Sequence, residues 1–96
     1  MSTSSEPTTT TVSQHETAIV LPANLHARPA GRLARAAAGF TSAIQLEYAG
    51  RTVNPTGVLA VMGLGATAGS TLTVRAEGHD ADEAVAALTQ ILSTAE

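Results

Sequence analysis

Two stretches of this chain alternate between apolar and polar side chains, and this alternation limits the possible fold more than any other feature. The apolar positions are Ile44, Leu46 and Tyr48 in Ala43–Tyr48, and Leu72, Val74 and Ala76 in Ser70–Ala76. A period of two predicts β-strands that bury one face. Strands of a parallel sheet are usually buried on both faces, so the pattern favours an antiparallel sheet that is covered on one side only.

Gly, Pro and Asn residues separate the other predicted elements. Thr17–Leu21 is predicted to be a strand, with Ile19 and Leu21 on one face, and Ala49-Gly50 is a tight turn into a third strand, Arg51–Val53. Helical spacing of apolar residues predicts helices over Arg28–Gly39, over Val58–Leu64 and after Asp80. The order β-α-β-β-α-β-α predicts an α+β domain with two layers, in which helices cover one face of an antiparallel sheet.

The two longer helices each have an apolar stripe that should face the core. The stripes are Ala30, Leu33, Ala34 and Ala37 in the first helix, and Ala81, Ala84, Val85, Leu88, Ile91 and Leu92 in the last. Asp80 and Glu83 have the spacing of a capping box, with Asp in place of the usual Ser or Thr. We therefore expect the Asp80 side chain to cap the last helix.

The first residues of the chain are a low-complexity run of Ser and Thr that has almost nothing to bury. We expect residues 1–15 to be a disordered leader and residues 16–96 to be one folded domain. The leader lacks the basic and apolar regions of a signal peptide, and no apolar run is long enough to span a bilayer, so a cytoplasmic protein without membrane insertion is expected.

The composition argues against several classes of function. The chain has no Cys and no Lys, five Arg against eight acidic residues, a formal charge of −3, and Phe40 and Tyr48 as its aromatic residues. Nucleic-acid binding is disfavoured because both phosphate neutralisation and base stacking need groups that are scarce here. His15, His26 and His79 lack the spacing of metal ligands, so no metal site is expected.

One segment, Leu25–Ala30, combines a histidine with the start of a helix. Pro29 suits the first helical turn, which places His26 beside backbone N–H groups that have no partner within the helix. Such a position binds anions, and phosphate in particular. Imidazole is also a nucleophile that titrates near neutral pH. The residues alone leave two interpretations of His26 open: a phosphoryl acceptor, or a polar surface residue.

Arginines gather on the same predicted helix. Arg28, Arg32 and Arg35 follow i, i+4, i+7 spacing and share one face. Arg28 is near enough to His26 to give a phosphate bidentate hydrogen bonds. A solvated arginine face is the alternative, and we favour it for Arg32.

The predicted short helix has no polar side chain, because Gly57–Leu64 contains only Gly, Ala, Val, Leu and Met. A helix this short cannot bury every face in a small domain. We expect some of Val58, Leu59 and Met62 to form an exposed apolar patch suited to docking proteins. The alternative is that a neighbouring loop covers them.

The segment Leu25-His26-Ala27-Arg28-Pro29-Ala30 resembles the active-site motif of HPr, the histidine-containing phosphocarrier of the bacterial sugar phosphotransferase system. Further segments resemble the family in order and spacing: Gly39–Ser42, Ala49–Arg51 and Val61–Gly65. The similarity runs from about Glu16 to Leu92. It implies an open-faced sandwich of four antiparallel strands with three helices on one face, as the element order also predicts.

The resemblance also implies roles. His26 would accept a phosphoryl group on Nδ1 from phosphorylated enzyme I and pass it to an EIIA domain, and Arg28 would stabilise the phosphoryl charge. The docking residues would be Ala27, Arg35, Val58, Leu59 and Met62. The chain would be a monomeric relay protein with a phosphohistidine intermediate and no cofactor, rather than an enzyme that turns over alone.

The chain departs from the family pattern at two positions. Many relatives have a serine at the start of the short helix that a kinase phosphorylates; Gly57 occupies this position here, and Thr56 beside it is a weak substitute. The residue two before the histidine is usually Gly, whereas here it is Asn24, which tolerates the left-handed conformation. Two alternatives to sugar transport remain: a regulatory protein-binding module, or a paralogue that serves nitrogen regulation or a dihydroxyacetone kinase.

Overall fold

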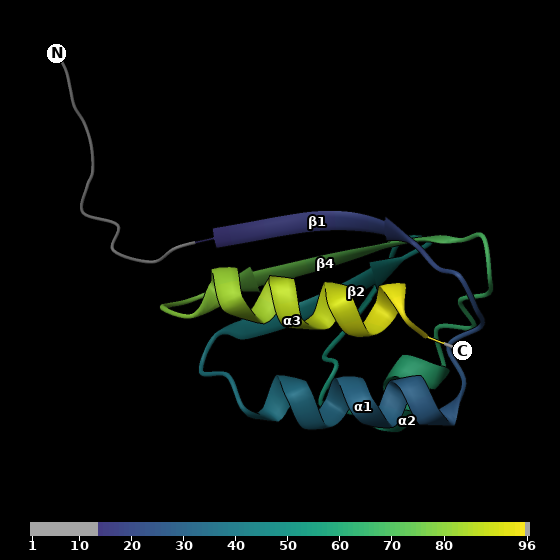
Figure 1. Cartoon of the computed structure of the whole chain (residues 1–96), viewed down its shortest axis with the longest axis horizontal. Helices are drawn as coiled ribbons and strands as arrows, with labels where there is room; N and C mark the ends of the chain where they lie inside the picture. Colours follow the sequence, from purple (N-terminus) through teal and green to yellow (C-terminus); the bar gives the residue numbers. More distant parts are fainter. Residues whose placement is uncertain (1–13, 96) are drawn as a thin grey trace, which may run out of the picture.

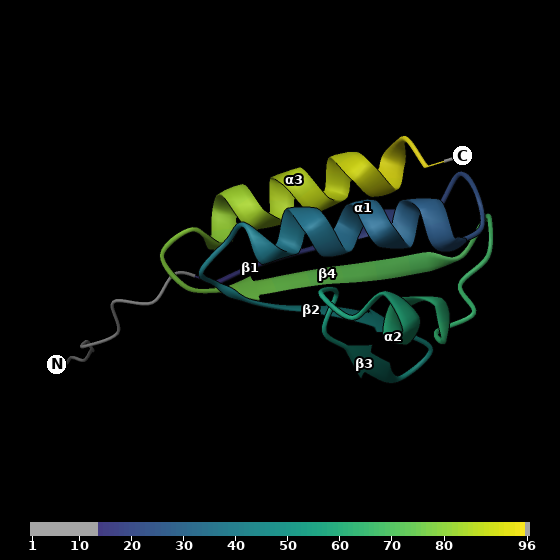
Figure 2. The same ribbon diagram turned by 90° about the horizontal axis from the view of Figure 1, so that it is seen from below.

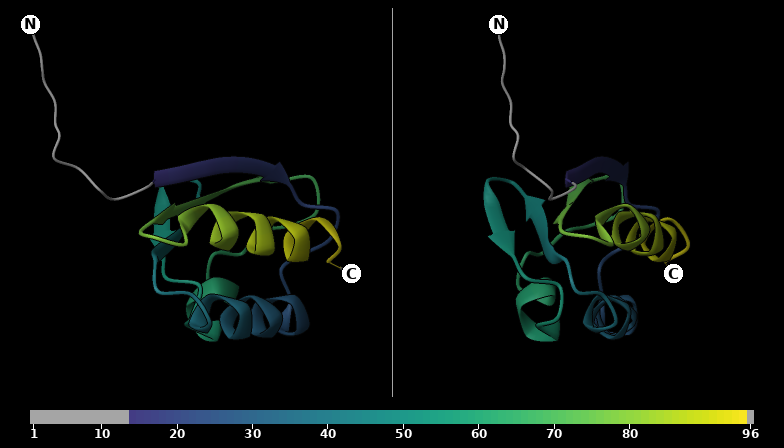
Figure 3. Two further views of the ribbon diagram at one scale, coloured as in Figure 1. Left: turned by 60° about the vertical axis from the view of Figure 1, so that its left-hand side comes forward. Right: turned by 90° about the vertical axis from the view of Figure 1, so that its left-hand side faces the viewer.

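The computed structural model describes residues 14–95, which form four strands and three helices in the predicted order (Figure 1). The elements are β1 (Gln14–Val20), α1 (Ala27–Ala38), β2 (Ala43–Tyr48), β3 (Arg51–Val53), α2 (Val58–Met62), β4 (Thr71–Glu77) and α3 (Ala81–Ser93). The fold is the predicted two-layer α+β sandwich, because all the described strands join one antiparallel sheet and the helices lie on one of its faces (Figures 2 and 3).

The strand order in the sheet is β1-β4-β2-β3, so the last strand in sequence lies between the first two. The register pairs Ile19 of β1 with Leu72 of β4, and Val74 of β4 with Leu46 of β2. These side chains share the face that the helices cover. The alternation in β2 and β4 therefore predicted the buried face correctly.

The core lies between the sheet and the helices. Its largest fully buried side chains include Leu33 of α1, Leu46, Leu72 and Val74 of the sheet, and Leu88 of α3. Complete burial of such a side chain stabilises a fold by about 1.5–3 kcal/mol. Helix α1 packs against both α2 and α3, which fixes its position and hence that of the loop before it.

The predicted apolar stripes are largely confirmed. In α1 the buried residues are Pro29, Ala30, Leu33 and Ala37, and Ala34 is only half-buried. In α3 the stripe is buried except for Ile91, which packs on the core while partly exposed.

Strand β1 begins earlier than the expected domain boundary. Gln14 and His15 belong to the strand, where they pair with Glu77 and Ala76 of β4. No sequence pattern marks this extension, because polar residues at the end of an edge strand are held by backbone hydrogen bonds to the neighbouring strand. Residues 1–13 lie outside the described part of the chain, so the disordered leader stays a prediction.

The expected capping box at α3 is wrong. Asp80 is the N-cap residue, but its side chain makes no capping hydrogen bond. Instead, its carboxylate accepts hydrogen bonds from the backbone N–H and the hydroxyl of both Thr41 and Ser42. These bonds, with that from the Ser42 hydroxyl foremost, lower the pKa of Asp80 from 3.8 to about 2. A tertiary contact thus replaces the local one.

Candidate functional site

His26 is the N-cap residue of α1. Its backbone is extended (φ −80°, ψ −175°), its carbonyl accepts from the Ala30 N–H at 3.0 Å, and its side chain makes no capping hydrogen bond. The residue is exposed. The imidazole is therefore free to react with a group that approaches from solvent.

The start of α1 is electrostatically open to an anion. The N–H groups of Ala27 and Arg28 have no carbonyl four residues earlier within the helix to bond to, and Pro29 has no N–H. No acidic residue stands in the first turn. The positive end of the helix dipole is consequently not neutralised by a side chain of this turn, which favours a phosphoryl group on His26.

Two loops meet beside His26. The loop between β1 and α1 is joined to the loop between α2 and β4 through backbone hydrogen bonds of Leu21 with Ser70 and Gly69, at 2.9 and 2.8 Å, and of Leu25 with Ala66, at 3.1 Å. The second loop has little sequence signal, because only Gly65 and Gly69 mark it and neither carries a reactive group.

Asn24 does not adopt the left-handed conformation that it was expected to tolerate in place of the usual glycine. Among the described residues other than glycine, a positive φ occurs at Ala49 alone (φ 52°). Asn24 instead uses its side chain, whose Oδ1 accepts from the Ala68 N–H at 2.8 Å.

A shallow depression of about 230 Å³ lies between these loops and α2. Its lining residues are Asn24, Leu25, His26, Met62, Gly65, Ala66 and Thr67. His26 and Met62, which were predicted separately as the reactive and a docking residue, therefore share one concavity.

The arginines of α1 are all exposed, as predicted from their spacing. Within residues 14–95, the arginine ion pairs are those of Arg75 on the sheet, with Glu16 at 3.0 Å and Glu47 at 2.8 Å. Arg28 is thus available to an external anion near His26. Arg35 lies in the last turn of α1, where the helix dipole favours a cation.

The predicted apolar patch is present beside α1. Leu59 is 82% exposed and Met62 is 38% exposed, whereas Val58 is half-buried against the core. Val61 is completely buried and anchors α2. Helix α2 is shorter than predicted and ends at Met62, because Leu64 turns into the core.

Comparison with known proteins identifies this arrangement. A family model described as "PTS HPr component phosphorylation site" matches residues 13–94. The chain belongs to the HPr family.

Solved HPr structures share the fold. The phosphocarrier protein HPr from Bacillus anthracis is 34% identical with a TM-score of 0.74, over 86% of this chain and 99% of that one. An HPr from Thermoanaerobacter tengcongensis is 32% identical with a TM-score of 0.72, over 83% and 90% of the two chains. Crh, a catabolite repression protein from Bacillus subtilis, is 34% identical with a TM-score of 0.68, over 77% and 85%. The neighbours thus include phosphocarriers and a regulatory relative.

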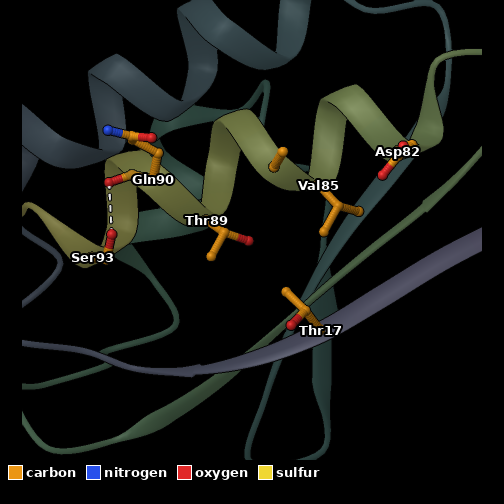
Figure 4. Close-up of a pocket in the computed structure, with 7 residues that line it drawn as sticks. Thr17, Asp82, Val85, Thr89, Gln90 and Ser93 are labelled. Carbon is orange, nitrogen blue, oxygen red and sulfur yellow. Dashed lines mark hydrogen bonds between the residues drawn. The ribbon is translucent and has the colours of Figure 1, made fainter.

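A second depression, of about 390 Å³, lies between α3 and β1 of this HPr-family fold (Figure 4). Thr17 of β1 faces Val85 and Thr89 of α3 across it, and none of the predicted site residues line it. The buried Thr89 Oγ1 makes no hydrogen bond to any described residue. Nothing here places a nucleophile beside an anion site, so the first depression is the candidate functional site.

Between residues 14 and 95, no three His, Asp or Glu side chains gather closely enough to share a metal ion. No helix in this part of the chain has the length and apolar character needed to cross a membrane.

Proposed function

We propose that this HPr-family domain is a phosphocarrier whose His26 accepts a phosphoryl group from phosphorylated enzyme I and passes it to an EIIA domain. The observation that carries the proposal is the uncommitted imidazole at the start of α1, beside N–H groups that lack helical acceptors. A cytoplasmic, monomeric relay protein follows from the same proposal.

The chemistry is an exchange of one N–P bond for another. The Nδ1 lone pair of neutral His26 attacks phosphorus, the N–P bond of the donor histidine breaks, and that imidazole leaves with its electron pair. The reverse exchange with an acceptor histidine regenerates His26. Because the bonds broken and formed are of the same kind, the protein mainly has to position the groups and stabilise the phosphoryl charge.

Arg28 supplies the charge in this proposal. It lies in the first turn of α1, two residues after His26, and its guanidinium can donate two hydrogen bonds to phosphoryl oxygens. The N–H groups of the first turn complete the anion site.

Docking would use the surface around the depression. Ala27 and Arg35 lie exposed on α1, and Leu59 and Met62 are exposed on α2, with Val58 at the border of the core. An apolar centre beside exposed arginines suits a partner with an apolar patch and acidic residues around it.

The test is phosphorylation by enzyme I and phosphoenolpyruvate. We expect one phosphate that is labile to acid and stable to base, as expected for phosphohistidine. His26→Ala should abolish it, whereas His15→Ala and His79→Ala, which remove the other two histidines, should leave it intact. Retention of the phosphate in His26→Ala would overturn the site, and an unmodified wild type would overturn the relay.

A regulatory binding module is the second candidate function. It is favoured by the likeness to Crh and by the 82% exposure of Leu59. If phosphorylation of His26 leaves partner affinity unchanged and no EIIA domain takes the phosphate, the results support the binding module rather than the phosphocarrier. Acceptor assays with a nitrogen-branch EIIA domain and a dihydroxyacetone kinase distinguish the paralogue roles. Control by seryl phosphorylation at the start of α2 is excluded chemically, because residue 57 is Gly.

A further inference from the structure

The side chain of Asn24 joins the loop that carries His26 to the loop opposite. The other contacts described above between these loops are backbone hydrogen bonds, which almost any sequence could make. The bond from the Ala68 N–H to Asn24 Oδ1, at 2.8 Å, depends on residue 24 having a side-chain acceptor.

Asn24 also contacts the reactive residue directly. Its main-chain carbonyl accepts from the His26 N–H at 2.9 Å, while its side-chain carbonyl accepts from Ala68. One residue therefore holds both the backbone of His26 and the opposite loop, whose Gly65, Ala66 and Thr67 line the depression together with His26. A shift of Asn24 would move the backbone that orients the imidazole relative to the first turn of α1.

We propose that Asn24 is a positioning residue for phosphoryl transfer, which acts by fixing the His26 loop against Ala68. This inference rests on the proposed function of His26. It predicts that loss of the carboxamide slows the chemical step more than it weakens partner binding, because Asn24 lies beside the docking residue Met62 in the depression but has no described hydrogen bond to a docking side chain.

The backbone conformation identifies the part of Asn24 that matters. Since Asn24 does not have a positive φ, the ability of glycine to adopt a left-handed conformation is no advantage at this position. Asn24→Gly and Asn24→Ala should therefore have the same defect, caused by the lost acceptor. Asn24→Asp keeps an oxygen that can accept from the Ala68 N–H.

The experiment uses phosphoramidate, a small phosphoryl donor that needs no docking surface. Its N–P bond breaks, ammonia leaves, and an N–P bond to His26 forms. Wild type, Asn24→Ala, Asn24→Gly and Asn24→Asp are compared for phosphorylation rate and for amide hydrogen exchange at Ala68. Asn54→Ala is the matched control, because Asn54 Oδ1 accepts a similar bond from the Thr56 N–H, at 2.9 Å.

We expect Asn24→Ala and Asn24→Gly to lose protection at Ala68 and to react about 10-fold more slowly, as expected for a misplaced nucleophile. Asn24→Asp should keep the protection and, near 1 M salt where its added charge is largely screened, recover most of the rate. Asn54→Ala should match wild type in both measurements. With enzyme I as donor, Asn24→Ala and Asn24→Gly should lower kcat by a larger factor than they change KM.

Faster exchange at Ala68 with an unchanged phosphorylation rate would overturn the proposal and leave Asn24 a purely structural residue. An equal loss of rate in Asn54→Ala would also overturn it, because the effect would then be general. A different result would overturn the proposed function: wild type would then react with phosphoramidate but not with phosphorylated enzyme I.

Discussion

Arg28 shows how much a single side chain can add to a site that the backbone already provides. The first turn of α1 offers N–H groups at fixed positions, whereas the guanidinium is planar and can reach two phosphoryl oxygens together. Its value in the proposed relay therefore depends on its shape as well as on its charge.

Arg28→Lys keeps the charge and loses the planar pair of donors. We expect phosphorylation by enzyme I to slow about 10-fold, which corresponds to the loss of one charge-assisted hydrogen bond in the transition state. Arg32→Lys, on the next turn of the same face, should leave the rate unchanged. Rapid-quench measurement of phosphohistidine formation tests both variants, and equal rates for Arg28→Lys and wild type would contradict the assigned role.

The fold stabilises the ionised form of the Asp80 side chain. Four donors from Thr41 and Ser42 converge on its carboxylate and hold its pKa at about 2, below the ordinary value of 3.8. The folded protein thus binds the carboxyl proton less tightly than the unfolded chain does. The stability contribution of Asp80 is fully present above pH 3.8 and is lost as the pH falls through about 2.

Asp80→Asn should lower the midpoint of urea unfolding at pH 7, because an amide nitrogen replaces one acceptor oxygen. The difference from wild type should shrink between about pH 4 and pH 2 as the wild-type carboxylate is protonated. Glu83→Gln, on the exposed side of the same helix, should show a much smaller difference. A gap between Asp80→Asn and wild type that does not depend on pH would contradict this explanation.

At the scale of elements, the β2–β3 hairpin was predicted correctly, and its turn holds local strain. Ala49 and Gly50 both have positive φ, 52° and 80°, the pattern of a type I′ turn. Glycine adopts this conformation freely, whereas alanine does so at a cost of about 1–2 kcal/mol.

Ala49→Asn should therefore raise the free energy of unfolding by about 1 kcal/mol, because Asn tolerates the left-handed conformation. Gly50→Ala should lower it. Urea unfolding of both variants supplies the measurement, and a destabilised Ala49→Asn would mean that the turn is not strained at this position.

The start of α2 offers a second test at this scale. Gly57 is the N-cap residue of α2 and provides no side-chain acceptor. The site has room for a side chain, because a Cβ at residue 57 would lie 3.4 Å from Ala60 Cβ and 3.6 Å from the Asn54 carbonyl oxygen, which is ordinary van der Waals contact. Gly57→Ser should stabilise the protein by about 0.3 kcal/mol through a capping bond, whereas Gly57→Ala should destabilise it. If urea unfolding showed Gly57→Ala to be more stable than Gly57→Ser, the missing cap would not be what limits the stability of α2.

These elements show where sequence reasoning succeeds and where it stops. Alternation in β2 and β4 and the Ala49-Gly50 turn are local patterns, so they predicted both the sheet and the hairpin. Asp80 has the local pattern of a cap, yet residues about 40 positions earlier compete for its carboxylate. Similarly, the spacing of His26 and Arg28 was enough to make them candidates, and their roles stay predictions. The contact of Asn24 with Ala68 joins residues 44 apart and leaves no sequence signal.

At the scale of the whole molecule, the described sheet has two free edges, the three-residue β3 and the seven-residue β1. Exposed edges can pair with another chain. Solved relatives include an HPr dimer from Thermoanaerobacter tengcongensis and Crh in a dimer with a swapped domain. In this chain, β1 carries a charged Glu16 that forms an ion pair with Arg75 of β4 at 3.0 Å.

We expect the protein to be a monomer, because a charged edge strand that is tied to its own neighbour disfavours pairing between copies. Light scattering coupled to size-exclusion chromatography should give a mass near 9.7 kDa over a wide range of protein concentration. Glu16→Thr, which removes the charge and the ion pair, should increase association. A stable dimer of wild type would contradict the expectation.

The starts of the helices have a consequence for how the molecule folds. At His26, Gly57 and Asp80, none of the three described helices has a side-chain hydrogen bond that caps its own N-terminus. Helices of 5, 12 and 13 residues without such caps are marginal in isolation. Helix formation must then coincide with assembly of the sheet, so the domain should fold in one cooperative step, without a populated helical intermediate.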